Sequence, residues 1–127
     1  MHKPNIKDFK HLVTLMEEDS NGEVEAYQQY QNIYIRGDMN ELMIRDHKPS
    51  GNLVIAQIEL IHKEQKTRLE ILKFLTNYGK ENGYSKIIAE SVYSPEYQKF
   101  FLENHFKEKE NKLSCYEPLC YELSLVD

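Results

Sequence analysis

The 127-residue sequence contains no tryptophan, only two cysteines and no excess of basic residues. Its 16 lysines and arginines are outnumbered by 21 acidic residues, which gives a formal net charge of −5. A general nucleic-acid binder or a protein that docks on anionic membranes would carry a basic excess, so we expect neither kind of partner. No stretch is apolar for long enough to cross a bilayer, and the N-terminus has no apolar signal-peptide region. We therefore expect a cytoplasmic protein.

The two cysteines, Cys115 and Cys120, are spaced as neither a zinc-binding pair nor a redox C-x-x-C motif. The five histidines are scattered along the chain. We expect reduced thiols beside a strand and no metal site, with a disulfide or a metal as the alternatives.

A hydrophobic content of 40%, with 11% aromatic residues, is typical of a globular protein, and the length suits one domain over residues 1–127. Hydrophobic periodicity and turn residues predict helices and strands in the order α, β-β-β, α, β, α, β-β. The expected helices cover 5–20, 67–82 and 95–104, and the expected strands cover the second half of 23–36, then 41–47, 53–61, 85–92 and 116–125. This order predicts an α+β sandwich in which a three-stranded antiparallel meander belongs to a mixed sheet.

The strand at 53–61 leads through a short charged link into an amphipathic helix. The sequence Thr67-Arg68-Leu69-Glu70 is a capping-box pattern, which predicts Thr67 as the N-cap. The residues expected to face the sheet are Leu69, Ile71, Leu72, Leu75 and Tyr78. In the helix after Ser94-Pro95, the residues expected in the core are Tyr97, Phe100 and Phe101. A strand that leads into a helix N-terminus is where α/β proteins commonly bind anionic cofactors.

Two segments carry a resemblance to a known family. Gln65-Lys66-Thr67-Arg68-Leu69-Glu70 lies at the strand-to-helix junction, and residues 94–106 read SPEYQKFFLENHF. They resemble the signatures Q/R-x-x-G-x-G/A and N-x-x-A-x-x-F-Y-x-x-x-G-F of the GNAT superfamily of N-acetyltransferases. The spacing agrees across residues 53–107, roughly half of the chain, although no clear first strand precedes the helix at Asn5.

The resemblance implies an acetyl-CoA-dependent transfer of an acetyl group to an amine. It implies that Gln65 and the amides of residues 66–70 hold the pyrophosphate and that the strand edge pairs with the pantetheine arm. The implied cofactor-binding residues are Leu60, Ile61, Gln65, Lys66, Thr67, Arg68, Leu69, Glu70 and Ser94. The implied general base is Glu59 or His62, and Tyr93 is the nearest phenol that could donate a proton. Each of these side chains could instead be an ordinary surface or packing residue.

Four positions depart from the family signatures. Arg68 and Glu70 replace glycines, Phe101 replaces a tyrosine that donates a proton in many members, and His105 replaces a helix-ending glycine. Two functions therefore remain open, an N-acetyltransferase that acts on an unidentified amine and a catalytically silent binding or interaction module. An unrelated α+β domain is a third alternative, and a separation between the strands at 53–61 and 85–92 would argue against it. A homodimer is compatible with the sequence.

Overall fold

The computed structural model describes residues 4–62, 65–109 and 120–126. Its elements follow in the order η1 (Ile6–Phe9), α1 (Lys10–Ser20), β1 (Glu25–Gln29), β2 (Asn32–Arg36), β3 (Glu41–His47), η2 (Lys48–Ser50), β4 (Asn52–Glu59), α2 (Gln65–Glu81), β5 (Lys86–Ala89), α3 (Pro95–Glu103), β6 (Lys107–Glu108) and β7 (Tyr121–Ser124). The first helical segment starts as the sequence predicts, because Asn5 and Asp8 form a capping box. Among the described residues, no helix is both long enough and apolar enough to cross a membrane.

The strands form one mixed sheet in the order β1-β2-β3-β4-β5-β7-β6. The first four strands are antiparallel, β4 and β5 run parallel, and β7 is antiparallel to both of its neighbours. The parallel pair is connected through α2, as a crossover connection requires. This arrangement confirms the predicted α+β class with a mixed sheet.

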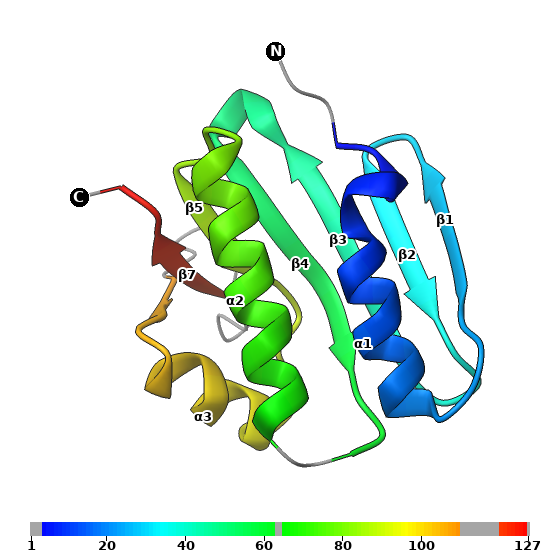
Figure 1. Ribbon diagram of the computed structural model, residues 1–127. Coiled ribbons are helices and arrows are strands. Elements are labelled where there is room, and N and C mark those ends of the chain that lie inside the picture. The colour runs from blue at the N-terminus through cyan, green and yellow to red at the C-terminus, as the bar shows by residue number, and fades with distance from the viewer. Residues whose placement is uncertain (1–3, 63–64, 110–119, 127) are drawn as a thin grey trace.

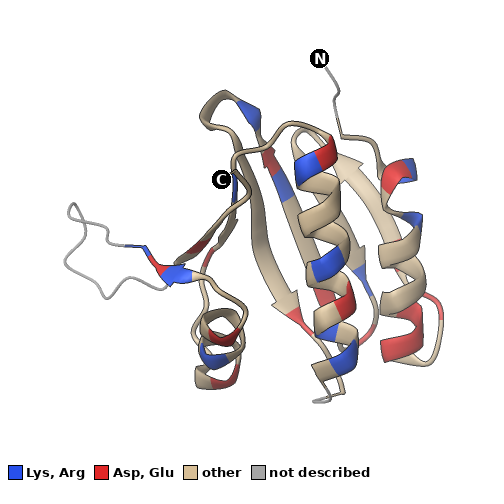
Figure 2. Cartoon of the chain, turned by 60° about the vertical axis from the view of Figure 1, so that its left-hand side comes forward, with Lys and Arg blue, Asp and Glu red and all other residues tan. Residues whose placement is uncertain are grey.

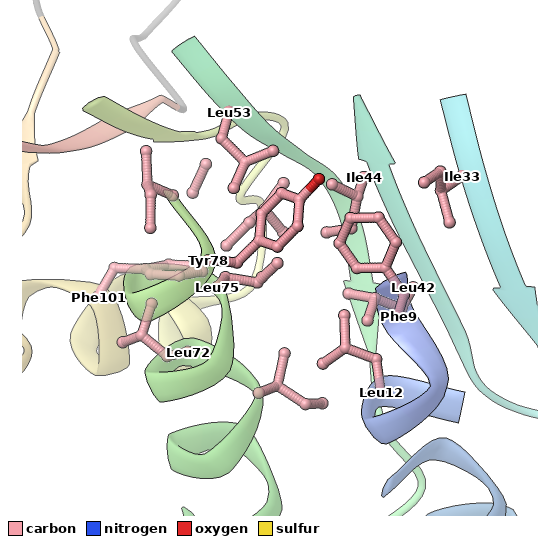
Figure 3. Close-up of a cluster of buried hydrophobic side chains, with 14 of the residues drawn as sticks. Phe9, Leu12, Ile33, Leu42, Ile44, Leu53, Leu72, Leu75, Tyr78 and Phe101 are labelled. Atoms are coloured by element: carbon pink, nitrogen blue, oxygen red, sulfur yellow. The ribbon is translucent and has the colours of Figure 1, made fainter. Parts of the chain in front are cut away.

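Helices α1 and α2 lie side by side over one face of the sheet (Figure 1). Their apolar faces meet alternate residues of the strands in a single core, part of which Figure 3 shows between the helices and β2 to β4. Phe9 and Tyr78 pack with ring centroids 4.8 Å apart, and this contact links the N-terminal segment to α2. Helix α3 adds Phe100 and Phe101 to the same core.

The segment 25–36 holds two strands, whereas the sequence analysis predicted one strand in the second half of 23–36. Strands β1 and β2 are joined at Tyr30 and Gln31, and Tyr30 has a φ of 56°. A bulky residue seldom adopts that conformation, and the chain carries no Asn-Gly or Asp-Gly pair at this turn to signal a hairpin. The meander therefore has four strands.

Helix α2 begins at Gln65, two residues before the predicted N-cap Thr67. Gln65 and Lys66 are good helix formers, so the helix includes them and Thr67 lies within its first turn. The predicted capping box at Thr67 and Glu70 is therefore wrong. The inward face also differs from the prediction, because Arg68 is buried while Leu69 is 42% exposed. The other four residues predicted to face the sheet are buried.

Three further strand boundaries differ from the predictions, and the first is that β4 ends at Glu59 rather than at 61. Strand β5 ends at Ala89 rather than at 92, and β7 begins at Tyr121, while residues 116–119 of the predicted last strand lie outside the described residues. The short strand β6, within a stretch that looked only charged in the sequence, pairs with β7. Cys120, just before β7, is a free thiol, and Cys115 lies outside the described residues.

Strands β4 and β5 separate at their carboxyl ends. Their pairing ends at Ile55 and Ala89, followed by one hydrogen bond in which the Glu90 N–H donates to the Ile55 carbonyl at 2.9 Å. Strand β4 continues to Glu59 and pairs only with β3 there, after a bulge that leaves Ala56 without a partner. The separation argues against the unrelated α+β domain that the sequence left open.

Candidate functional site

A cleft of about 510 Å³ occupies the space between the separated ends of β4 and β5. Its walls come from the end of β4, the β5–α3 connection, the first turn of α3 and the turn before β3. The lining residues are Met39, Gln57, Ile58, Glu59, Leu60, Glu90, Ser91, Val92, Tyr93, Ser94 and Tyr97. Within the described sheet, residues 57–59 have no strand partner on the cleft side, so an extended ligand could hydrogen-bond to their backbone.

Two carboxylates line the cleft, Glu59 from β4 and Glu90 just after β5. The Glu59 carboxylate accepts a hydrogen bond from the Gln57 side-chain amide at 3.1 Å. The Glu90 carboxylate accepts one from Arg45 Nη1 at 3.0 Å, and the Arg45 Nε–H donates to Asn32. Arg45 of β3 therefore holds Glu90 from across β4. Among the described residues, Glu59 is hydrogen-bonded only to its own strand, so it is the better placed of the two to take up a proton.

The opposite wall carries hydroxyl groups. Tyr93 is 72% exposed at the rim, and Ser94 stands just before α3. Tyr97 is half-buried, and its hydroxyl accepts a hydrogen bond from the Leu60 N–H at 3.1 Å. Burial raises the pKa of Tyr97, although the nearby Arg68 guanidinium acts in the opposite direction. The Tyr97 proton is therefore retained at neutral pH, and its oxygen is already fixed at the end of β4.

Asp19 at the end of α1 ties down the segment after β4. Its buried carboxylate accepts hydrogen bonds from the Ile61 N–H at 2.8 Å, the His62 N–H at 3.0 Å and the Asn40 side-chain amide at 2.8 Å. His62 Nδ1 lies 3.2 Å from the same carboxylate. Burial alone would raise the pKa of Asp19, but these hydrogen bonds, led by the His62 amide, together hold it below its ordinary value.

An ion pair joins the N-terminal ends of α2 and α3. Arg68 forms it with Glu96, and the Arg68 guanidinium also lies 4.5 Å from the centroid of the Tyr97 ring. The Arg68 side chain is 3% exposed, whereas that of Glu96 is 44% exposed. The pair therefore lies directly behind the cleft wall that Tyr97 forms. Within the described ranges, no group of histidine, cysteine and acidic side chains could hold a metal ion.

The similarity of this chain to known proteins is visible in its structure and not in its sequence. No protein-family model matches the chain, and no curated protein matches it. The structure is similar to that of a GNAT-family acetyltransferase from Staphylococcus aureus, with 10% identity, 98% of each chain covered and a TM-score of 0.59. The PaiA N-acetyltransferase from Thermoplasma acidophilum, solved with coenzyme A, covers 97% of this chain and 96% of its own at 10% identity and a TM-score of 0.53.

This chain has the GNAT fold. A GNAT-family protein from Chromobacterium violaceum is similar over 76% of this chain with 12% identity and a TM-score of 0.56, and the chain spans 61% of its length. The separated β4–β5 pair, with α2 between the two strands in the chain, agrees with the expectation drawn from the two sequence segments. At these identities the likeness establishes the fold and leaves the chemistry to the residues of this chain.

The GNAT fold brings four of the predicted site residues into the cleft: Glu59, Leu60, Tyr93 and Ser94. The others lie elsewhere. Ile61 and His62 are bound to Asp19, and the His62 ring is outside the cleft lining. The remaining predicted residues, Gln65, Lys66, Thr67, Arg68, Leu69 and Glu70, form the first turn and a half of α2. In the part of the chain that the structure describes, no side chain accepts a hydrogen bond from the amides of residues 65–67.

Sequence reasoning missed three parts of this site. Glu90 follows a buried strand and could have been proposed from that position, but its partner Arg45 lies 45 residues away. Asp19 looked like one of several acids at the end of α1. Tyr97 was predicted as core beside Phe100 and Phe101, whereas it is only partly buried and lines the cleft. Phe101 stands where many family members have a proton-donating tyrosine. It is fully buried and has no hydroxyl group, so this position supplies no proton.

Proposed function

We propose that this chain is an acyl-CoA-dependent N-acyltransferase that transfers an acetyl or related acyl group to an amine. The observation that carries the proposal is the cleft between β4 and β5, with a carboxylate on one wall and a fixed tyrosine hydroxyl on the other. The GNAT fold supports the same reaction class, and the PaiA relative was solved with coenzyme A.

The cleft suits the pantetheine arm of acyl-CoA better than it suits the diphosphate group of the same molecule. A narrow cleft beside the strand edge at residues 57–59 fits an extended chain that contains amide groups. At the start of α2, the side chain of Arg68 stands where the family signature has a glycine, and the carboxylate of Glu96 lies against it. We expect the arm to bind along β4 and the diphosphate to lie near the first turn of α2.

The acyl donor supplies a thioester, whose carbonyl carbon forms a bond to the amine nitrogen as its bond to sulfur breaks. Before that step, Glu59 takes one proton from the ammonium group, which leaves the neutral amine as the nucleophile. The nitrogen loses its second proton to water as the amide forms. The departing thiolate gains a proton from a tyrosine of the cleft, and water then reprotonates that tyrosine. Tyr97 is the proposed donor to the thiolate, and Tyr93 is the alternative because both line the cleft.

Isothermal titration calorimetry with acetyl-CoA and, separately, with free CoA tests the proposal first. We expect a Kd no weaker than about 100 μM, which corresponds to about −5.5 kcal/mol. Release of free thiol from acetyl-CoA in the presence of a panel of amines then tests transfer. Absence of binding heat at millimolar acetyl-CoA would overturn the proposal.

The second candidate function is a GNAT-fold binding module that transfers nothing. The Arg68–Glu96 pair favours it, because a carboxylate lies close to where the family holds a diphosphate. This alternative predicts that acetyl-CoA fails to bind even when the protein is folded and concentrated.

A further inference from the structure

The two members of the Arg68–Glu96 pair lie in different electrostatic environments. Arg68 lies in the first turn of α2, where the positive end of the helix dipole disfavours a cation. Glu96 lies in the first turn of α3, where a carboxylate is favoured. Figure 2 shows the basic residues at the N-terminal end of α2, the end that faces α3. Glu96 is thus stabilised by its own helix as well as by Arg68, whereas Arg68 depends on an anion.

Arg68 is also incompletely bonded. Its Nε–H is buried and has no hydrogen-bond acceptor among the residues that the structure describes. A buried donor without a partner costs free energy, and the cost is larger for a charged group. The 17-residue helix α2 therefore begins beside a guanidinium that still has a donor to offer to an anionic group.

The position of the pair connects it to the cleft. The guanidinium lies on the ring of Tyr97, and the Tyr97 hydroxyl is bonded to the end of β4. An anion at the far end of a ligand that follows β4 toward α2 would meet Arg68 and Glu96 together. Glu96 would repel it, and the Glu96 side chain is 44% exposed.

We propose that Glu96 is an internal latch that occupies, with its own carboxylate, the anion site formed by Arg68 and the start of α2. The latch makes the cleft select donors by their thioester arm, because a diphosphate gains Arg68 only by displacing Glu96. This inference rests on the proposed acyl-CoA-dependent function. It assigns Arg68 and Glu96 to donor specificity rather than to the acyl-transfer chemistry.

The direct test uses inorganic diphosphate with the wild-type protein, E96Q and the control E103Q. Glu103 lies on the same helix, and its loss removes the same charge while leaving Arg68 untouched. We expect E96Q to bind diphosphate at least tenfold more tightly than wild type, and E103Q to bind it like wild type. Equal affinities in all three proteins, or equal gains in both variants, would overturn the latch.

A nitrogen-15 NMR titration of E96Q reports on Arg68 itself. Diphosphate should move the Arg68 Nε–H resonance together with the amide resonances of residues 65–68, and it should leave them in place in the wild type. Shifts confined to other basic side chains would overturn the assignment of Arg68 as the partner of the anion.

A comparison of S-acetylpantetheine with acetyl-CoA tests the latch separately from the proposed function. S-acetylpantetheine carries the thioester and the arm without any phosphate. The wild type should bind it within threefold of acetyl-CoA, and E96Q should favour acetyl-CoA by at least tenfold. A wild type that already prefers acetyl-CoA by tenfold or more would contradict the latch. If E96Q binds diphosphate more tightly but neither thioester binds to any variant, the latch stands and the transferase proposal fails.

Discussion

At the scale of single residues, one buried carboxylate organises the segment that leaves β4. Asp19 accepts hydrogen bonds from two consecutive backbone amides and from Asn40, whose amide group also donates to the Met16 carbonyl at 3.1 Å. These bonds connect α1, the turn before β3 and the start of the β4–α2 link. The position of the cleft wall at Leu60 therefore depends on a residue that does not line the cleft.

Replacement of Asp19 by asparagine should destabilise the protein by about 2 kcal/mol at pH 7, since hydrogen bonds to a charged group contribute about 1.5–3 kcal/mol. Its folded-state pKa lies below the ordinary 3.8, so its contribution is fully present above about pH 4 and is lost as the pH falls through the folded-state pKa. Urea unfolding of both proteins at pH 7 and pH 3 measures this difference. The gap should shrink at pH 3, and the exposed Asp38→Asn control should show little change at either pH. A gap that stays constant with pH would contradict the assignment.

Glu59 should affect transfer more than binding. The E59Q variant keeps the shape of the side chain and its place beside Gln57 but cannot accept the proton, so we expect kcat to fall by about 100-fold. Its affinity for acetyl-CoA should stay within twofold of wild type. The matched control is E25Q on β1, an exposed position far from the cleft. Unchanged kcat in E59Q would remove Glu59 as the general base.

At the scale of elements, helix α2 presents a face that differs from the one its periodicity predicts. Leu72 is buried and Leu69 is partly exposed, while Arg68 is turned inward to reach Glu96 and Tyr97. The ion pair and the ring contact fix the rotation of the first turn, where a surface-exposed leucine costs little.

This rotation of α2 predicts that the same leucine-to-glutamate substitution has a small effect on stability at position 69 and a large one at position 72. L69E should alter stability by less than about 0.5 kcal/mol, as surface substitutions usually do. L72E should cost more than about 3 kcal/mol, because it buries an unpaired charge. Chemical unfolding of the two variants measures both values. A similar loss in both variants would mean that Leu69 faces the core.

The turn between β1 and β2 carries backbone strain. Tyr30 is 85% exposed and has a φ of 56°, a conformation that glycine adopts without cost. Y30G should therefore raise stability by about 0.5–1 kcal/mol, whereas E25G within the extended strand β1 should lower it. Thermal unfolding of the two variants distinguishes these effects. A loss of stability in Y30G would contradict the strain.

At the scale of the whole molecule, the sheet is most strongly supported at its centre. Strand β4 is hydrogen-bonded on both sides over residues 52–55, and α2 lies over the same region (Figure 1). The outermost strands, β1 and β6, pair on one side within the described sheet. Local opening should therefore start at the outer strands rather than at the centre.

Hydrogen exchange followed by mass spectrometry tests this gradient. Peptides from β3, β4 and β5 should exchange at the slowest rates, and those from β1 should exchange at least tenfold faster. Residues 56–59 of β4 should exchange faster than 52–55, because β5 has separated from them, and a bound thioester should slow them. Uniform exchange across the sheet would contradict the gradient.

Local patterns in the sequence were sufficient for the class of fold. Alternation identified β3 and β4, the spacing of apolar residues identified the three helices, and Ser94-Pro95 marked the start of α3 within one residue. Of the residues predicted for the site, Glu59, Leu60, Tyr93 and Ser94 line the cleft between β4 and β5, whereas the predicted residues 61, 62 and 65–70 at the β4–α2 junction lie outside its lining. These features depend on residues close together in the chain, which is why pattern and spacing were enough.

The tertiary structure decided which side chains meet. Arg68 and Glu96 are 28 residues apart, Arg45 and Glu90 are 45 apart, and Asp19 is 43 residues from His62. No local pattern relates such pairs, because their contacts depend on how helices and strands rotate as they pack. The same packing turned Arg68 inward and placed Tyr97 at the cleft, and the buried guanidinium there meets the Glu96 carboxylate and the Tyr97 ring. Periodicity alone would have exposed the arginine.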